Sequence, residues 1–407
     1  MKKSLLALAV AAALPAAAQA QSNITLYGIA DIGVEYSNGA ANSSNTQAGK
    51  SGIRVSSSLG TGSRLGIRGS ENLGGGLSAI FTIEHRFNLD TGDTAGGNVF
   101  LLPGAANTAF NNKFWNGLAW AGLKGGWGQV TLGRQYTPIF DVAAPADFSG
   151  YWYYNNWSST QGDNIGGASG VFVPMGPVRT DNSIKYTSPS FGGLTVVATY
   201  AFGENYYGNT PASCITSACL SGSDINGTQD IWGVAAGWKM GGLYLAGGYH
   251  SFSNKVGYYS SGSLATSNAV YKDVWLATAS YDFGGFGLSL GYSKSDFEQQ
   301  FTAATALTKP SLSNILFSAY ANFGPGKFIV NGYYSDVKDF RTAVTTYAQG
   351  GNALSLGLTY AWALSNRTTL YATVGLNDTS PLVANNVTIN TGIDSRQRYA
   401  IGLNHKF

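Results

Sequence analysis

The chain has little charge, few thiol or imidazole side chains and, after its first residues, no long apolar run. Of its 407 residues only 11% are charged, and it holds 2 Cys and 3 His. Soluble domains normally carry about a quarter charged residues, so this composition argues against an ordinary soluble globule. After residue 20 no stretch reaches the ~18 apolar residues that a membrane-spanning helix needs. A membrane-resident chain of this composition must therefore cross with strands.

The scarcity of histidine and cysteine also limits the chemistry of the chain. His85, His250 and His405 fall in different expected strands, and no His, Cys and carboxylate spacing indicates a metal site. Nothing places a serine beside a histidine and an acid, as a hydrolase requires. The formal net charge of +3 predicts no nucleic-acid partner. We therefore expect no cofactor, no metal and no enzymatic reaction.

The first twenty residues are typical of a secretory signal peptide. Lys2 and Lys3 form a basic start, residues 5–14 an apolar stretch, and residues 18–20 a small-x-small cleavage site. We expect residues 1–20 to be removed and residues 21–407 to form one domain. Export places Cys214 and Cys219 in an oxidising compartment, and we expect a disulfide between them, with free thiols as the alternative.

What the chain has instead is a β-rich composition, with 55 Gly, 24 Tyr and 20 Phe. On composition alone, a secreted glycine-rich β-protein is an alternative. Strict period-two alternation recurs, as at residues 286–292, where apolar residues alternate with small or polar ones. Such alternation predicts about sixteen strands. They are expected at 24–36, 63–73, 77–87, 115–123, 127–136, 182–188, 194–202, 230–239, 243–252, 271–281, 286–297, 311–322, 327–337, 352–362, 368–377 and 394–407.

The connections between these strands alternate in length. Short glycine-rich turns fall at 74–76, 124–126, 190–193, 240–242, 282–285, 323–326 and 363–367. Long polar loops fall at 37–62, 88–114, 137–181, 203–229, 253–270, 298–310, 338–351 and 378–393. Strands of ~10 residues with short turns on one side and long loops on the other are typical of an outer-membrane barrel. Closure follows because an open sheet edge would leave unpaired backbone groups in hydrocarbon. The sequence therefore predicts a sixteen-stranded antiparallel transmembrane β-barrel.

Charged residues at inward-facing strand positions are the candidate functional residues, because a barrel tolerates charge in its lumen. Parity places Arg64, Arg68, Glu84, Arg86 and Asp31 on the inward face. A barrel of this circumference is too wide for side chains to fill. The loop at 137–181 is far longer than an ordinary connection and is the candidate to narrow it.

Several motifs resemble the general bacterial porin family, in particular the trimeric porins of beta-proteobacteria. They are residues 26–31 (LYGIAD), 63–77 (SRLGIRGSENLGGGL), 130–138 (VTLGRQYTP), 179–186 (RTDNSIKY) and the terminal Phe407. Together they cover nearly all of the expected mature chain. The resemblance implies an outer-membrane homotrimer of sixteen-stranded barrels with short periplasmic turns and a third loop folded inward as an eyelet. Its partners would be outer-membrane lipid, lipopolysaccharide, and small hydrophilic solutes and ions.

In such porins, wall arginines face acids on the eyelet loop. By motif position, Arg64, Arg134 and Arg179 resemble the basic side, Glu84 a wall acid, and Asp147 the eyelet-loop acid. An intralumenal salt bridge is the alternative role for each arginine. The parity of Arg134 points outward unless the strand end bulges.

Two features leave the specificity open. Where anion-selective relatives carry an arginine, this chain has Asn116-Gly117-Leu118, which leaves the sign of the ion selectivity undecided. Five aromatic residues of the eyelet loop either narrow the pore, offer stacking surfaces to sugars or aromatic solutes, or pack against the barrel wall. They are Tyr151, Trp152, Tyr153, Tyr154 and Trp157.

The function that follows is passive diffusion of ions and small hydrophilic solutes through a water-filled pore, filtered by size and charge at the eyelet. Two alternatives are a solute-specific channel and a surface receptor or adhesin whose loops are the functional part.

Overall fold

The structure is a computed structural model of the chain. It describes residues 23–38, 51–95, 114–153, 174–202, 224–225, 229–254, 268–300, 309–340, 349–379, 382–384, 387–389 and 395–407.

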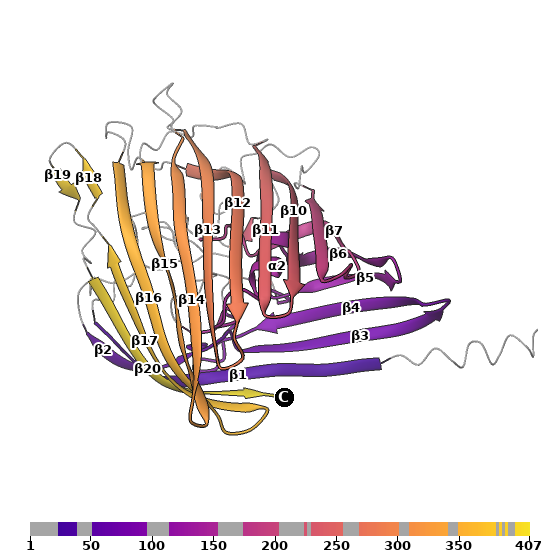
Figure 1. Cartoon of the computed structure of the whole chain (residues 1–407), viewed down its shortest axis with the longest axis horizontal. Helices are drawn as coiled ribbons and strands as arrows, with labels where there is room; N and C mark the ends of the chain where they lie inside the picture. Colours follow the sequence, from indigo (N-terminus) through magenta and orange to yellow (C-terminus); the bar gives the residue numbers. More distant parts are fainter. Residues whose placement is uncertain are drawn as a thin grey trace, which may run out of the picture.

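Sixteen long strands form the wall of a single antiparallel barrel (Figure 1). Neighbours along the chain pair with each other, and the last strand pairs with the first, which closes the sheet. The prediction of a sixteen-stranded barrel is confirmed. The wall strands are β1 (Asn23–Ser37), β3 (Arg64–Gly74), β4 (Leu77–Arg86), β5 (Ala119–Gly125), β6 (Gly128–Tyr136), β7 (Arg179–Thr187), β8 (Leu194–Ala201), β10 (Gln229–Met240), β11 (Leu243–Asn254), β12 (Asn268–Asp282), β13 (Phe286–Gln300), β14 (Ser311–Phe323), β15 (Gly326–Phe340), β16 (Gln349–Ala363), β17 (Thr368–Thr379) and β20 (Ser395–Lys406).

The closing seam runs along β1. One edge of β1 pairs with β20 from Ile29 to Ser37, and the other edge pairs first with β3 and then with the short strand β2 (Gly52–Ser57). The backbone groups of this seam are thus satisfied within the sheet, as a strand in hydrocarbon requires.

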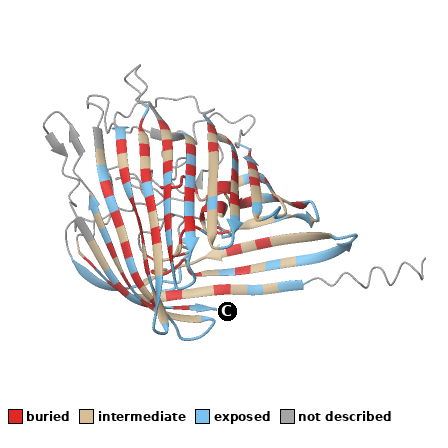
Figure 2. Cartoon of the chain, in the orientation of Figure 1, coloured by how far each residue is buried: buried red, intermediate tan, exposed pale blue. Residues whose placement is uncertain are grey.

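The two faces of the wall differ in chemistry, and burial alternates along each strand (Figure 2). On β13, Leu288 and Leu290 are 56% and 62% exposed, whereas Ser289 and Ser293 between and beyond them are 8% and 0% exposed. The outer face is therefore apolar and the inner face small and polar, which suits lipid outside and water inside. Aromatic residues beside the short turns are all exposed on the outer face, as in an interfacial girdle; they are Trp127, Phe191, Phe283, Phe286, Phe323, Phe328 and Trp362.

The long loops contain short elements that the sequence analysis did not predict. They are β2, the helix α2 (Pro138–Ala143), β9 (Asp224–Ile225), β18 (Leu382–Ala384) and β19 (Val387–Ile389). The strand expected at 115–123 begins only at Ala119. The residues just before it remain bonded to β4: the Glu84 N–H donates to the Leu118 carbonyl at 2.7 Å, and the Asn116 side chain accepts from the Arg86 N–H at 2.7 Å and donates to the Arg86 carbonyl at 3.1 Å. No helix in the described ranges is long and apolar enough to cross a membrane.

Candidate functional site in the barrel lumen

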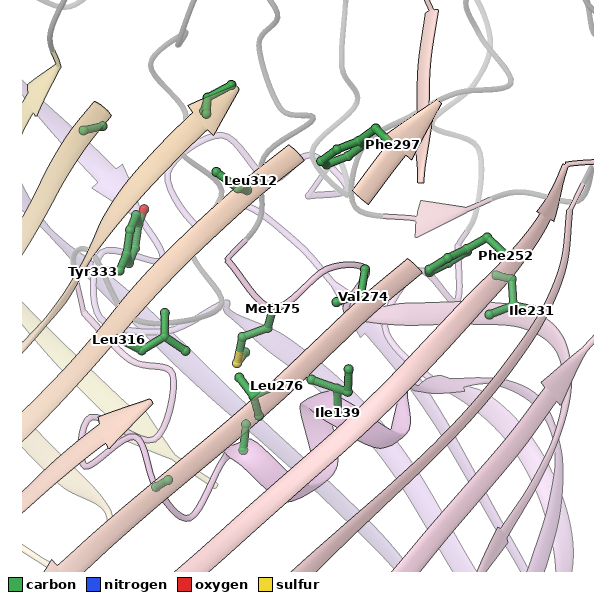
Figure 3. Packing of buried hydrophobic residues seen from close by; sticks show 14 of the residues in the cluster. Ile139, Met175, Ile231, Phe252, Val274, Leu276, Phe297, Leu312, Leu316 and Tyr333 are labelled. Atoms are coloured by element: carbon green, nitrogen blue, oxygen red, sulfur yellow. The ribbon is translucent and has the colours of Figure 1, made fainter. Parts of the chain in front are cut away.

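The loop between β6 and β7, which we call the long loop, lies against the inward-facing side chains of the wall. Its helix α2 begins at Pro138, a residue suited to a first helical turn because it lacks the N–H that would go unpaired there. Ile139 and Met175 are buried among Val274, Leu276 and Leu316 of β12 and β14 (Figure 3). These contacts hold the described part of the loop by apolar burial.

Polar contacts fix the same loop at several points around the wall. Tyr244 on β11 donates to the carbonyl of Val142 at 2.7 Å, and Ser318 on β14 accepts from the Phe148 N–H at 2.9 Å. The Tyr153 N–H donates to the carbonyl of Gly60, just before β3, at 2.5 Å. The loop thus contacts the wall from β11 to the β2–β3 connection.

Four of the predicted residues come together in one group, which we call the arginine cluster: Arg64, Arg86, Arg179 and Glu84. Glu84 is paired with Arg86 at 3.0 Å and with Arg64 at 3.9 Å, and its side chain is only 3% exposed. Arg86 also donates to the hydroxyl of Tyr136 at 2.8 Å, and the Arg179 guanidinium lies 4.9 Å from the centre of the Tyr136 ring. Three positive charges and one negative charge give the cluster a net charge of +2.

The strand register explains this grouping. Arg64 and Arg86 are directly opposite on β3 and β4, where like charges repel. Glu84 lies two residues before Arg86 and so shares its face, which places a carboxylate between the two guanidinium groups. Arg64 donates further to the Gly62 carbonyl and the Thr61 hydroxyl, both at 2.9 Å. The cluster is therefore held in a fixed geometry.

Arg134 and Arg68 make separate contacts. The register of β6 against β7 shifts between Gly133 and Gln135, and Gly133 has a φ of 126°, so a bulge turns Arg134 from its expected direction. Arg134 is 7% exposed, donates twice to the Asn116 carbonyl and pairs with Asp181 at 2.5 Å. Arg68 lies 5.3 Å from the centre of the Tyr27 ring.

The two remaining predicted acids are tied into the fold. Asp31 is fully buried, and its carboxylate accepts from the Gly60 N–H, the Thr61 N–H, the Tyr371 hydroxyl and the Asn404 amide, at 2.8–3.2 Å. It thereby joins β1, β17 and β20 to the segment before β3. Asp147 of the long loop is 2% exposed and accepts from the Ser149 backbone and hydroxyl at 2.9 and 2.6 Å.

Three of the loop aromatics pack within the lumen. The Tyr151 ring lies 4.4 Å from Phe140, Tyr153 lies 5.2 Å from Tyr371, and the Lys406 ammonium lies 4.6 Å from the centre of the Trp152 ring. Tyr154, Trp157, Cys214 and Cys219 lie outside the described residues.

Sequence reasoning missed several residues of the lumen. Lys185 on β7 pairs with Asp141 of α2 at 2.8 Å, and its inward parity was the available signal. His250 on β11 is fully buried, and its Nε2 accepts from the Ile139 N–H at 3.3 Å. Two further residues had no signal in the sequence. Tyr136, which precedes the long loop, contacts Arg86 and Arg179, and Asp181 pairs with Arg134 beside the bulge. In the part of the chain that the structure describes, no group of three His, Cys or acidic residues is placed to hold a metal.

Comparisons with known proteins agree with the barrel. A family model described as Gram-negative porin matches residues 7–382. Outer membrane porin protein 32 of Delftia acidovorans is 36% identical over 50% of this chain and 50% of that protein, so the match spans about half the length of that relative. An outer membrane porin protein of Bordetella pertussis is 29% identical over 91% of this chain and 93% of its own length.

Among solved structures, an anion-selective porin from Comamonas acidovorans is similar in fold, with a TM-score of 0.63 and 24% identity over 95% of this chain and 100% of that one. The family inferred from the sequence motifs is thereby confirmed. A closed sixteen-stranded barrel, with a family match over nearly its whole length, shows that this chain belongs to the Gram-negative porins of the bacterial outer membrane.

Proposed function

We propose that the protein is a passive, water-filled channel for ions and small hydrophilic solutes, without enzymatic activity, and that it prefers anions. The porin family and the closed barrel support the channel. The anion selectivity of the Comamonas porin agrees with this preference but belongs to that protein.

The observation that carries the anion preference is the balance of charge on the inner face. Basic residues outnumber acidic residues at the inward-facing positions of the described wall strands. The bases are Arg64, Arg68, Arg86, Lys124, Arg134, Arg179, Lys185, Lys239, Lys327, Arg398 and Lys406, and the acids are Asp31, Glu35, Glu84, Asp181 and Asp282. All of these acids are already engaged. Asp31 accepts four hydrogen bonds, and Asp282 accepts from the Tyr320 hydroxyl and the Gly284 N–H. Glu35 pairs with Arg54 at 2.7 Å, Glu84 with Arg86 at 3.0 Å and Asp181 with Arg134 at 2.5 Å. A lumen of one predominant sign concentrates counter-ions and so sets selectivity.

We place the eyelet between the arginine cluster and the long loop. Arg64, Arg86 and Arg179 form its basic side, with Glu84 among them, and the loop with Asp147 forms the opposite side. Support comes from the loop contacts, which run from β11 to Gly60 beside the cluster. Asn116 does not replace a missing arginine here, because its side chain is bonded to the Arg86 backbone. Arg64, Arg86 and Arg179 carry the positive charge of the eyelet instead.

Assembly and processing complete the proposal. We expect a homotrimer, supported by large apolar side chains on the outer face of the earliest strands, such as Ile24, Leu26 and Ile53, at 66%, 62% and 76% exposed. We expect cleavage after Ala20, which would leave the mature chain to begin close to β1 at Asn23.

The test is the reversal potential of the purified protein in a planar bilayer under a KCl gradient. A potential of the sign for chloride permeation, with conductance in three equal steps, supports an anion-preferring trimer. A potential of the opposite sign overturns the anion preference and leaves the channel. Absence of conductance from a correctly folded protein overturns the channel itself and favours a receptor or adhesin.

A further inference from the structure

A row of aromatic rings connects the arginine cluster to the long loop. Tyr136, the last residue of β6, lies directly opposite Arg179 at the start of β7. The Phe140 ring of α2 lies 4.5 Å from the Tyr136 ring, with an angle of 20° between the two planes, and the Tyr151 ring lies 4.4 Å from the Phe140 ring. We call Tyr136, Phe140 and Tyr151 the aromatic stack. Rings at such distances attract each other beyond the gain from burial alone.

The first ring of the aromatic stack contacts two arginines of the cluster. The Tyr136 hydroxyl accepts a hydrogen bond from Arg86 at 2.8 Å, and the Arg179 guanidinium lies 4.9 Å from the centre of the same ring. A guanidinium over an aromatic ring is attracted by the ring quadrupole. Because a guanidinium is planar, stacking also fixes the directions of its five N–H groups. Tyr136 therefore orients two of the three positive side chains of the cluster.

The other end of the aromatic stack is fixed within the long loop itself. The Tyr151 hydroxyl donates to the Phe140 carbonyl at 3.0 Å. Tyr151 has a φ of 63° and Gly150 before it a φ of 64°, a left-handed backbone that a tyrosine rarely adopts. Such a conformation persists only where the surrounding contacts impose it. Ile139, the residue before Phe140, is fully buried in the apolar cluster that includes β12 and β14. The loop thus holds the rings in place without help from the arginines.

We infer that the aromatic stack positions the arginine cluster, so that the long loop sets the charge selectivity of the pore as well as its width. Tyr136 acts on the arginines by direct contact, Phe140 acts through Tyr136, and Tyr151 holds Phe140. Without the stack, the guanidinium groups keep their charge but lose their fixed directions, and the positive charge spreads over a larger volume. The inference rests on the proposed channel function. It implies that a displacement of the loop changes the size filter and the charge filter together.

The test is the ratio of chloride to potassium permeability, obtained from the reversal potential of the purified protein in a planar bilayer under a KCl gradient. Phe140→Leu keeps an apolar side chain and changes no charge. It should nevertheless lower the ratio about two- to fivefold, the range that corresponds to the loss of one cation–π contact. Phe140→Tyr keeps the ring and should retain the wild-type ratio. The expected direction is the same whichever ion the wild type prefers.

Two substitutions of Tyr136 separate its two contacts. Tyr136→Phe retains the ring beside Arg179 and removes only the acceptor of Arg86, whereas Tyr136→Leu removes both contacts. We expect a smaller shift of the permeability ratio from Tyr136→Phe than from Tyr136→Leu. Phe148→Leu is the matched control, because Phe148 lies on the same loop but its ring packs 5.0 Å from Tyr320 on β14, outside the aromatic stack. It should shift the ratio far less than the stack variants do.

A double-mutant cycle shows whether Phe140 acts through an arginine. In an Arg179→Gln background, Phe140→Leu should lower the permeability ratio clearly less than it does in the wild type, because the charge that the stack positions is already gone. The urea midpoint of the heat-modifiable gel mobility is measured for each variant and verifies that it is folded. A purely structural role of the stack would lower this midpoint and leave the permeability ratio unchanged.

The inference is overturned if Phe140→Leu and Tyr136→Leu channels keep the wild-type permeability ratio, or if Phe140→Leu shifts the ratio equally in the wild-type and Arg179→Gln backgrounds. Either result leaves the channel intact, because it is obtained from conducting protein. Absence of conductance from the folded wild type overturns the proposed channel, and the positioning role with it.

Discussion

Gly28 and the terminal Phe407 close the barrel with a reciprocal pair of backbone hydrogen bonds, Gly28 N to Phe407 O at 2.9 Å and Phe407 N to Gly28 O at 3.1 Å. The Phe407 ring covers the glycine so closely that a Cβ at residue 28 would overlap the ring and approach the Arg64 carbonyl to 2.8 Å. The first strand therefore needs glycine where the last strand ends.

The first prediction concerns this contact. Gly28→Ala should displace the Phe407 ring or the backbone and destabilise the barrel by about 1–3 kcal/mol, as overpacking does. The urea midpoint of the loss of heat-modifiable gel mobility measures the effect. Gly52→Ala is the control, because a Cβ there meets nothing within 4 Å. Equal midpoints for both variants would contradict the proposed overlap.

Asp31 carries the second prediction. Asp31→Ala leaves two backbone N–H groups, the Tyr371 hydroxyl and the Asn404 amide without their acceptor, at a cost of about 1–3 kcal/mol for each group left unpaired. We expect a large loss of stability, together with a changed conductance, because the segment that binds Tyr153 of the long loop is released. Asp90→Ala, at an exposed position, should leave both quantities unchanged. Wild-type stability of Asp31→Ala would show that the carboxylate is not an anchor.

The arginine cluster gives the third prediction. Arg86→Gln should shift the reversal potential toward cations, and Glu84→Gln should shift it toward anions, because the two changes alter the lumenal charge in opposite directions. Arg367→Gln removes a positive charge from an exposed turn and is the control. Shifts of the same sign from Arg86→Gln and Glu84→Gln would argue that pore shape, and not charge, sets the selectivity.

The sequence predicts those features of the structure that depend on the regular alternation of inward and outward side chains along each strand. The wall strands show this alternation, so the alternation and the glycine-rich turns were enough to predict the strands and the inward positions of Arg64, Glu84 and Arg86. The direction of the Arg134 side chain departs from this alternation, because the strand register shifts at Gly133, whose φ is 126°. Only the structure reveals Asp181 as the partner of Arg134.

The contacts of the long loop also lie beyond sequence reasoning. Asp141 and Lys185 are 44 residues apart, and His250 is 111 residues from Ile139. No local pattern links these residues, because the loop is positioned by burial of Ile139 and Met175 against strands that follow much later.

The fourth prediction separates the role of Arg134 from that of the arginine cluster. Arg134→Ala and Asp181→Ala should each destabilise the barrel, and a double-mutant cycle should give a coupling of about 1–3 kcal/mol, because the Arg134 side chain is only 7% exposed. The pair Lys294 and Asp296, at 2.9 Å but about one third exposed on both sides, is the comparison and should couple weakly. If Arg134→Gln changes the reversal potential as much as Arg86→Gln does, Arg134 belongs instead to the pore lining.

His250 supplies the last prediction, about the stability of the constriction. Its Nε2 accepts from the Ile139 N–H, so the ring proton resides on Nδ1 and the imidazole is neutral. His250→Leu retains an apolar side chain but removes this polar contact between β11 and the start of α2, so the helix should move more freely. We expect larger fluctuations of the open-channel current, together with a loss of stability of no more than about 1–3 kcal/mol, because one buried N–H, that of Ile139, loses its acceptor. His405→Leu, on the exposed outer face, is the control. If the open-channel current of the His250→Leu variant fluctuates no more than that of the wild type, burial of Ile139 alone holds the helix in place.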